Sequence, residues 1–137
     1  MEKINVQISW SGNNFCATVS GERINGCVVT TNKTLDGVKK DFKEALDFHI
    51  EGSLQDGDVI PEWLVKGEYE ITYEFDVSAL LHNLDGVVTR AAISRATGIN
   101  ERQLGHYASG FRNPRPQQKD KIIQGIRNIG KELISVV

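Results

Sequence analysis

The side chains best suited to chemistry in this chain are hydrogen-bonding and cationic groups that gather between positions 100 and 121. Arg102 can donate two hydrogen bonds to a guanine edge, and Glu101 can accept one from cytosine. Arg112, Asn113, Arg115, Lys119 and Lys121 suit phosphate oxygens, which give affinity and register rather than sequence choice. The candidate DNA-binding residues are Asn100, Glu101, Arg102, Gln103, Gly105, His106, Tyr107, Arg112, Asn113, Arg115 and Lys119.

The elements expected to position these residues are two short helices joined by a tight turn. Thr89 is a suitable N-cap for a helix over 90–97, and Gly98 suits the left-handed backbone that ends it. Asn100 caps the next helix, and Gln103 can complete a capping box unless it contacts an adenine or a phosphate. Leu104 and Tyr107 are expected to point inward. This pattern predicts a helix-turn-helix whose second helix reads the major groove; the alternative is a helical hairpin in a bundle.

Further helices are expected on both sides of this motif. The segment "VSALLHNL" predicts a helix over 77–84. A longer one over 118–134 carries Ile122, Ile126, Ile129 and Leu133 on one stripe. Between the motif and this last helix, Pro114 and Pro116 are expected to hold "GFRNPRP" extended, and Pro116 is also suited to lead into the last helix.

The first half of the chain has the period of strands. Residues 4–10, 14–20 and 68–75 alternate apolar and polar side chains, and 27–31 is β-branched. Thr34 opens an amphipathic helix that is expected to end near Gly52. The order β-β-β-α-β predicts an α+β layer pair over 1–75, and residues 76–137 are expected to form an all-α second domain.

Charge divides the chain at the same place. Residues 1–75 hold 7 Lys+Arg against 13 Asp+Glu, whereas residues 76–137 hold 9 against 5. This division predicts two different partners, one of them a polyanion.

The sequence does not favour an enzyme, a metalloprotein or a membrane protein. Cys16 and Cys27 lack metal-ligand spacing, and no nucleophile elbow, P-loop or zinc motif occurs. No apolar run reaches the ~20 residues of a membrane span. The expectations are therefore no catalytic residue, no metal, no cofactor, no membrane and a cytoplasmic location.

The segment "TRAAISRATGINERQLGHYASGFRNPRPQQKDKIIQGI" resembles the helix-turn-helix of lambda-repressor-like (Cro/C1-type) regulators. The β-β-β-α-β order before it, with "KTLDGVKKDFKEALDFHIE", resembles HicB-type antitoxins. The resemblance implies a HicB-like toxin-binding domain over 1–75 and an all-α lambda-repressor-like DNA-binding domain over 76–137.

It also implies the function and the partners. The bacterial protein would be the antitoxin of a type II toxin–antitoxin module. It would neutralise a small basic ribonuclease (HicA-like) and repress its own operon by binding operator DNA as a homodimer, which can pair into a tetramer. The alternative is a stand-alone repressor whose first half dimerises or senses a ligand. A third class, an RNA-binding module, is disfavoured by the acidic first half.

Overall fold

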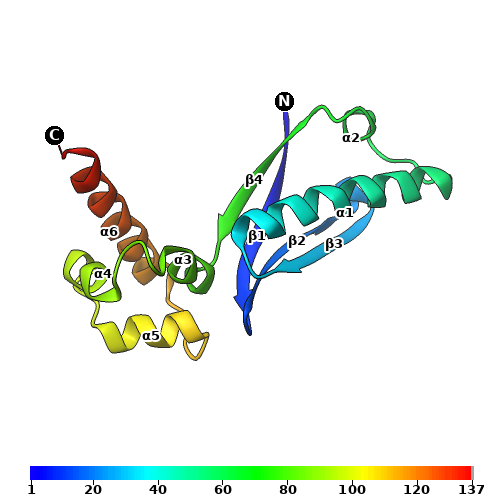
Figure 1. The fold of residues 1–137 in the computed structure, drawn as a ribbon. Helices are drawn as coiled ribbons and strands as arrows, with labels where there is room; N and C mark the ends of the chain where they lie inside the picture. Colours follow the sequence, from blue (N-terminus) through cyan, green and yellow to red (C-terminus); the bar gives the residue numbers. More distant parts are fainter. Residues whose placement is uncertain (137) are drawn as a thin grey trace. The chain divides into compact units, whose positions relative to one another are not determined.

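The structure, a computed structural model, describes residues 1–136 (Figure 1). The first strands are β1 (Glu2–Ser11), β2 (Asn14–Gly21) and β3 (Gly26–Asn32), with the short 3-10 helix η1 (Glu22–Ile24) before β3. Helices α1 (Leu35–Gln55) and α2 (Glu62–Val65) then precede β4 (Tyr69–Phe75). The remaining elements are α3 (Val77–Leu84), α4 (Arg90–Thr97), α5 (Glu101–Ser109) and α6 (Pro116–Ile134).

The expected fold class, a HicB-like β-β-β-α-β domain followed by an all-α lambda-repressor-like domain, is wrong. Residues 1–136 have an α+β fold with a four-stranded mixed sheet and six α-helices, the strands coming first. No separate all-α helix-turn-helix domain is distinguishable in this range. The physical reason is that the helices follow the sheet without a linker, because Asp76 is the single residue between β4 and α3. Its N–H still donates to the Ile8 carbonyl of β1 at 2.9 Å.

Within this fold, close contacts gather in two units, which we describe separately. The sheet unit is Met1–Asp76, and the helical unit comprises the described residues from Val77 onward.

The sheet unit is built on a sheet with the strand order β3-β2-β1-β4. The strands β1, β2 and β3 pair antiparallel, whereas β4 pairs parallel to β1, with Ile8 opposite Phe75. A parallel pair needs a long crossover, and α1 lies in that connection. The turn between β1 and β2 contains Gly12 with a φ of 63°, a conformation that favours glycine.

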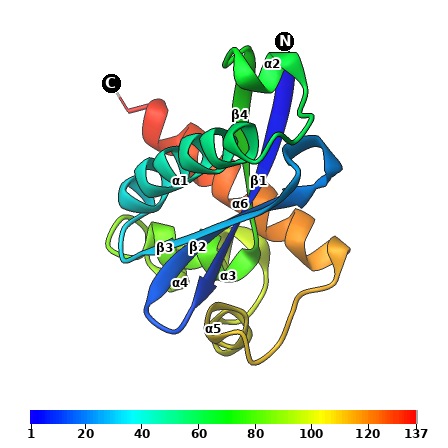
Figure 2. The same cartoon turned by 90° about the vertical axis from the view of Figure 1, so that its right-hand side faces the viewer.

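One face of the sheet is covered by α1 (Figures 1 and 2). Alternate residues of β1, namely Ile4, Val6 and Ile8, are at most 4% exposed, as the strand period predicts. The apolar stripe of α1 supplies the facing layer, with Phe42 and Leu46 fully buried. Burial of this kind contributes about 25 cal/mol per Å² of apolar area.

Lysines of α1 reach over the aromatic side chains of β4. Lys43 Nζ donates to Tyr69 Oη at 2.7 Å and to Asp47 Oδ1 at 2.8 Å. Burial by itself would lower the pKa of Lys43, but these hydrogen bonds outweigh it and raise the pKa above its usual value. Lys39 Nζ lies 4.6 Å from the ring centroid of Tyr73, and burial raises the pKa of the Tyr73 hydroxyl.

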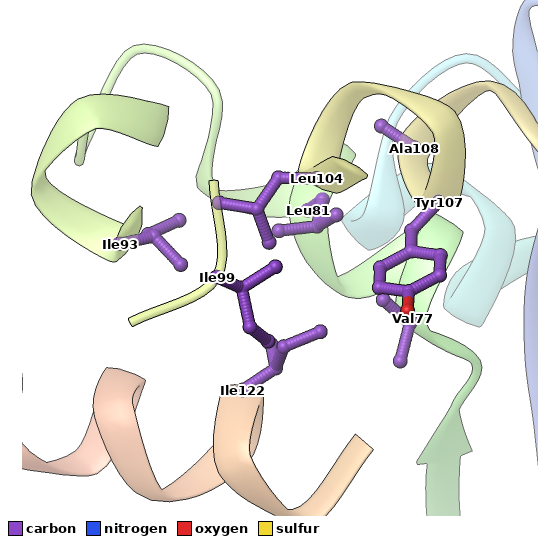
Figure 3. Close-up of a cluster of buried hydrophobic side chains, with 8 residues drawn as sticks. All are labelled: Val77, Leu81, Ile93, Ile99, Leu104, Tyr107, Ala108 and Ile122. Carbon is purple, nitrogen blue, oxygen red and sulfur yellow. The ribbon is translucent and has the colours of Figure 1, made fainter. Parts of the chain in front are cut away.

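The helical unit packs around one apolar cluster, shown in Figure 3. The side chains of Leu104, Ile99 and Ile122 point toward one another, and each is at most 6% exposed. The full cluster is Val77, Leu81, Ile93, Ile99, Leu104, Tyr107, Ala108 and Ile122. All four helices and the α4–α5 turn contribute to it, so the turn is held by the core and not only by its own hydrogen bonds.

Candidate nucleic-acid interface

The turn between α4 and α5 is fixed by local hydrogen bonds. Gly98 has a φ of 77°, and its N–H donates to the Ser94 carbonyl at 2.8 Å, which ends α4. The Asn100 side chain accepts from the Gln103 N–H at 2.8 Å, which begins α5. Between them the Ile99 N–H donates to the Thr97 hydroxyl at 3.1 Å. The predicted caps at Thr89, Gly98 and Asn100 are therefore confirmed.

Packing decides which side of α5 is outward. Leu104, Tyr107 and Ala108 are at most 4% exposed, and their spacing of three and four residues places them on one side of the helix. Asn100, Glu101 and Arg102 are exposed. Among the predicted contact residues, Gln103, Gly105 and His106 are half-buried, and Tyr107 is a core residue.

Gly105 lies at an open position of α5. A Cβ atom built there meets no heavy atom within 4 Å, apart from its chain neighbours and the backbone of its own helix. A glycine inside a helix costs about 1 kcal/mol relative to alanine. Packing within the protein therefore gives no reason for this glycine.

The segment after α5 folds back onto the end of that helix. The Arg112 N–H donates to the His106 carbonyl at 3.2 Å, and the rings of His106 and Phe111 meet edge to face at 5.1 Å. Phe111 is nonetheless 72% exposed, and the Arg112 guanidinium lies 5.6 Å from its ring centroid. His106 Nδ1 is buried and has no hydrogen-bond partner among residues 1–136. The backbone hydrogen bond and the contact with Phe111 orient Arg112, which is the first basic residue after α5.

A polar concavity of about 590 Å³ lies where α5, the exit segment and the start of α6 meet. Its lining consists of Gln103, Tyr107, Arg112, Asn113, Arg115, Gln117, Gln118 and Lys121. Five of these belong to the predicted DNA-contacting set. Six others lie outside the lining, namely Asn100, Glu101, Arg102, Gly105, His106 and the half-buried Lys119.

The chemistry of this concavity is that of an anion site. Arg112, Arg115 and Lys121 are exposed cations along its wall. Arg115 is also the N-cap of α6, where no side-chain cap bond forms, and Pro116 is at the first helical position. The beginning of a 19-residue helix therefore presents backbone N–H groups and the positive end of its dipole to the same space.

Gln117 and Gln118 are the lining residues that the sequence interpretation did not name. A sequence signal existed, because Pro116 marks the first turn of a helix and the two following residues carry the free N–H groups. Their amide side chains add donors that suit phosphate oxygens.

Two further observations on residues 1–136 concern metal ligands and membrane spans. No group of three or more His, Cys, Asp or Glu side chains in that range is arranged to hold a metal ion. None of its helices combines the length and apolar character that crossing a membrane requires. Of the two free cysteines, Cys16 is half-buried and Cys27 is exposed.

Comparison with known proteins adds no further constraint. No protein-family model matches the chain, and neither the curated proteins nor the solved structures give a significant match.

Proposed function

We propose that this protein is a bacterial antitoxin of the type II class, which binds operator DNA with its helical unit and a basic ribonuclease toxin with its sheet unit. The observation that carries the proposal is the basic concavity beside the exposed side of α5. Residues 77–137 hold 9 Lys+Arg against 4 Asp+Glu, whereas residues 1–76 hold 7 against 14. Opposite charges favour different partners, a polyanion for one unit and a cationic protein for the other.

In the DNA complex, α5 lies in the major groove. Arg102 and Glu101 are exposed in its first turn, where recognition helices contact base edges. Arg102 would donate to guanine and Glu101 would accept from cytosine. The open position at Gly105 lets the helix approach the bases closely.

The basic concavity positions the protein on the DNA backbone. A phosphate seated there would meet Arg112, Arg115 and Lys121 together with the N–H groups at the start of α6. Such contacts release counterions and contribute affinity on any sequence. Two copies related by two-fold symmetry would place their α5 helices about 34 Å apart on an inverted repeat. A homodimer is therefore the proposed DNA-binding form.

The sheet unit would neutralise the toxin by covering its RNA-binding surface. A ribonuclease must attract a phosphate backbone, so that surface is positively charged, and the acidic sheet unit complements it. Both activities place the protein in the cytoplasm, where the operon and its transcript are found.

The DNA-binding proposal is tested with three alanine variants of the full chain, measured by fluorescence anisotropy on operator and random duplexes. Arg102→Ala should lose about 1–3 kcal/mol on the operator and relax base preference. Arg115→Ala should weaken binding to both duplexes and flatten the dependence of log K on log salt. Lys131→Ala is the control, because it lies sixteen residues along α6 from Arg115, or about 24 Å.

Equal salt slopes for Arg115→Ala and the control would reject the phosphate role. Full sequence discrimination in Arg102→Ala would reject the base contact. Co-expression with the product of the adjacent reading frame tests the toxin, and recovery of the protein without a partner would favour a stand-alone repressor.

A further inference from the structure

The two edges of the sheet differ in a way that the DNA-binding proposal does not use. The edge strand β4, "YEITYEF", carries Glu70 and Glu74, and charged side chains are a usual protection against edge-to-edge pairing. The opposite edge strand β3, "GCVVTTN", carries no charge and no proline over seven residues. It pairs with β2 on one side, and no strand within residues 1–136 pairs with its other side. The backbone of β3 is thus open to an added strand.

A groove of about 460 Å³ runs beside β3, between this strand and α1. Phe48 lines it from α1 and is 78% exposed, and Val29 lines it from β3 and is 54% exposed. Ala45 and Gly52, three residues before and four after Phe48, also line the groove. Because one has only a methyl group and the other no side chain, they leave space beside the ring. An aromatic ring left in water beside small residues is typical of an anchor for a partner.

The charge of the groove selects its occupant. Its lining includes Asp56 and Asp58 but no lysine or arginine. Glu44 and Glu51 flank Phe48 on the helix surface, at four residues before and three after it. A second copy of the chain would bring these carboxylates against one another, which opposes self-pairing. A cationic segment would instead be attracted.

We propose that the free edge of β3 receives an extended, positively charged strand of the basic toxin, which becomes the fifth strand of the sheet. Backbone hydrogen bonds to β3 supply affinity, and the alternate side chains of the added strand supply specificity. Apolar side chains of that strand pack on Phe48 and Val29, and cationic ones face Asp56 and Asp58. This inference rests on the proposed function and adds to it the surface by which the toxin is held.

The test uses the full chain co-expressed with the basic protein encoded by the adjacent reading frame. Hydrogen exchange compares the amides of β3 in the free protein and in the complex, and titration measures the affinity of variants. Phe48→Glu should weaken the complex at least tenfold, as should the charge reversal Glu51→Lys. Val65→Glu and Glu68→Lys are matched controls at exposed positions that do not line the groove, and they should bind as the wild type does.

The outcomes separate the two proposals. Slower exchange in β3 with weaker binding of both Phe48→Glu and Glu51→Lys supports the added strand. A stable complex in which β3 exchanges freely and Phe48→Glu binds normally overturns it while the antitoxin function stands. Absence of a complex with the wild-type chain overturns both. Concentration-dependent protection of β3 in the protein alone would instead identify a second copy as the occupant. Retained operator binding by Phe48→Glu shows that the variant is folded.

Discussion

Gly125 gives the sharpest prediction about stability, because the contact between α6 and α4 depends on its lack of a side chain. It is buried in the middle of α6, and a Cβ atom built on it would lie 2.5 Å from Thr97 Cγ2 of α4. The Thr97 side chain cannot turn aside without loss. Its hydroxyl donates to the Ile93 carbonyl at 2.8 Å and accepts from the Ile99 N–H at 3.1 Å. Gly125→Ala should therefore destabilise the helical unit.

The magnitude follows from opposing terms. Alanine improves the helix propensity of α6 by about 1 kcal/mol. The clash can be relieved in one of two ways. Turning Thr97 away would break two hydrogen bonds, at about 0.5–1.5 kcal/mol each. Moving the helices apart would instead cost about 1–3 kcal/mol, as overpacking of a core does. Either change costs about 1–3 kcal/mol, so after the propensity gain of about 1 kcal/mol the expected net loss is up to about 2 kcal/mol. Gly130→Ala on the same helix is the control, because a Cβ atom there meets no heavy atom within 4 Å apart from its chain neighbours and the backbone of its own helix. It should therefore show the full propensity gain of about 1 kcal/mol.

The assay is native-state hydrogen exchange at the buried residues Leu104 and Ile122, which reports the opening free energy of the helical unit separately from the sheet. Thr97→Ser removes the clashing methyl group and keeps the hydroxyl. It should recover most of the loss in the Gly125→Ala background, with a coupling energy of about 1 kcal/mol or more. If Gly125→Ala gained as much stability as Gly130→Ala, or if serine at 97 recovered nothing, the close contact would not be what requires the glycine.

Three further results are expected. Asn100→Ala removes the cap of α5 and should cost about 0.5–2 kcal/mol in the same exchange measurement. Gly105→Ala should stabilise the free protein by up to about 1 kcal/mol while weakening operator binding in the anisotropy assay, and unchanged binding would show that α5 does not press on DNA there. Because burial raises the pKa of Tyr73, its contribution to stability is complete below about pH 10 and is lost as the pH rises through the folded-state pKa. Denaturation midpoints of the wild type should therefore fall more steeply above pH 10 than those of Tyr73→Phe.

The features that could be predicted from the sequence are those set by local geometry. The caps at Thr89 and Asn100 and the left-handed Gly98 depend on residues at most four positions apart, and all three are present. The inward direction of Leu104 follows from helical periodicity and is confirmed by its full burial. Strand alternation likewise predicted the buried residues of β1.

The features that could not be predicted depend on contacts between distant residues or on the absence of a neighbour. The predicted fold class was wrong because the sheet continues to the residue that precedes α3. There the Asp76 N–H donates to the Ile8 carbonyl, which is sixty-eight positions away in the sequence. The end of α1 was placed near Gly52, yet the helix continues to Gln55, because the φ of Gly52 is not positive and Ser53 is buried. The left-handed residue beyond the helix is Gly57, with a φ of 76°.

Phe48 was missed for a different reason, since amphipathic periodicity identifies a core stripe and treats the rest of the helix as solvated. An exposed aromatic residue that lies outside the apolar stripe, with Glu44 and Glu51 beside it on the helix surface, is a signal that periodicity alone does not detect.

The exposure of such residues also makes the functional proposals testable, because folding depends little on side chains that lie outside the core. Arg102 on α5 and Phe48 on α1 are both exposed and lie outside their cores. Substitutions there change binding surfaces in a protein that still folds, so a loss of DNA binding by one and of toxin binding by the other would assign the two activities to separate surfaces.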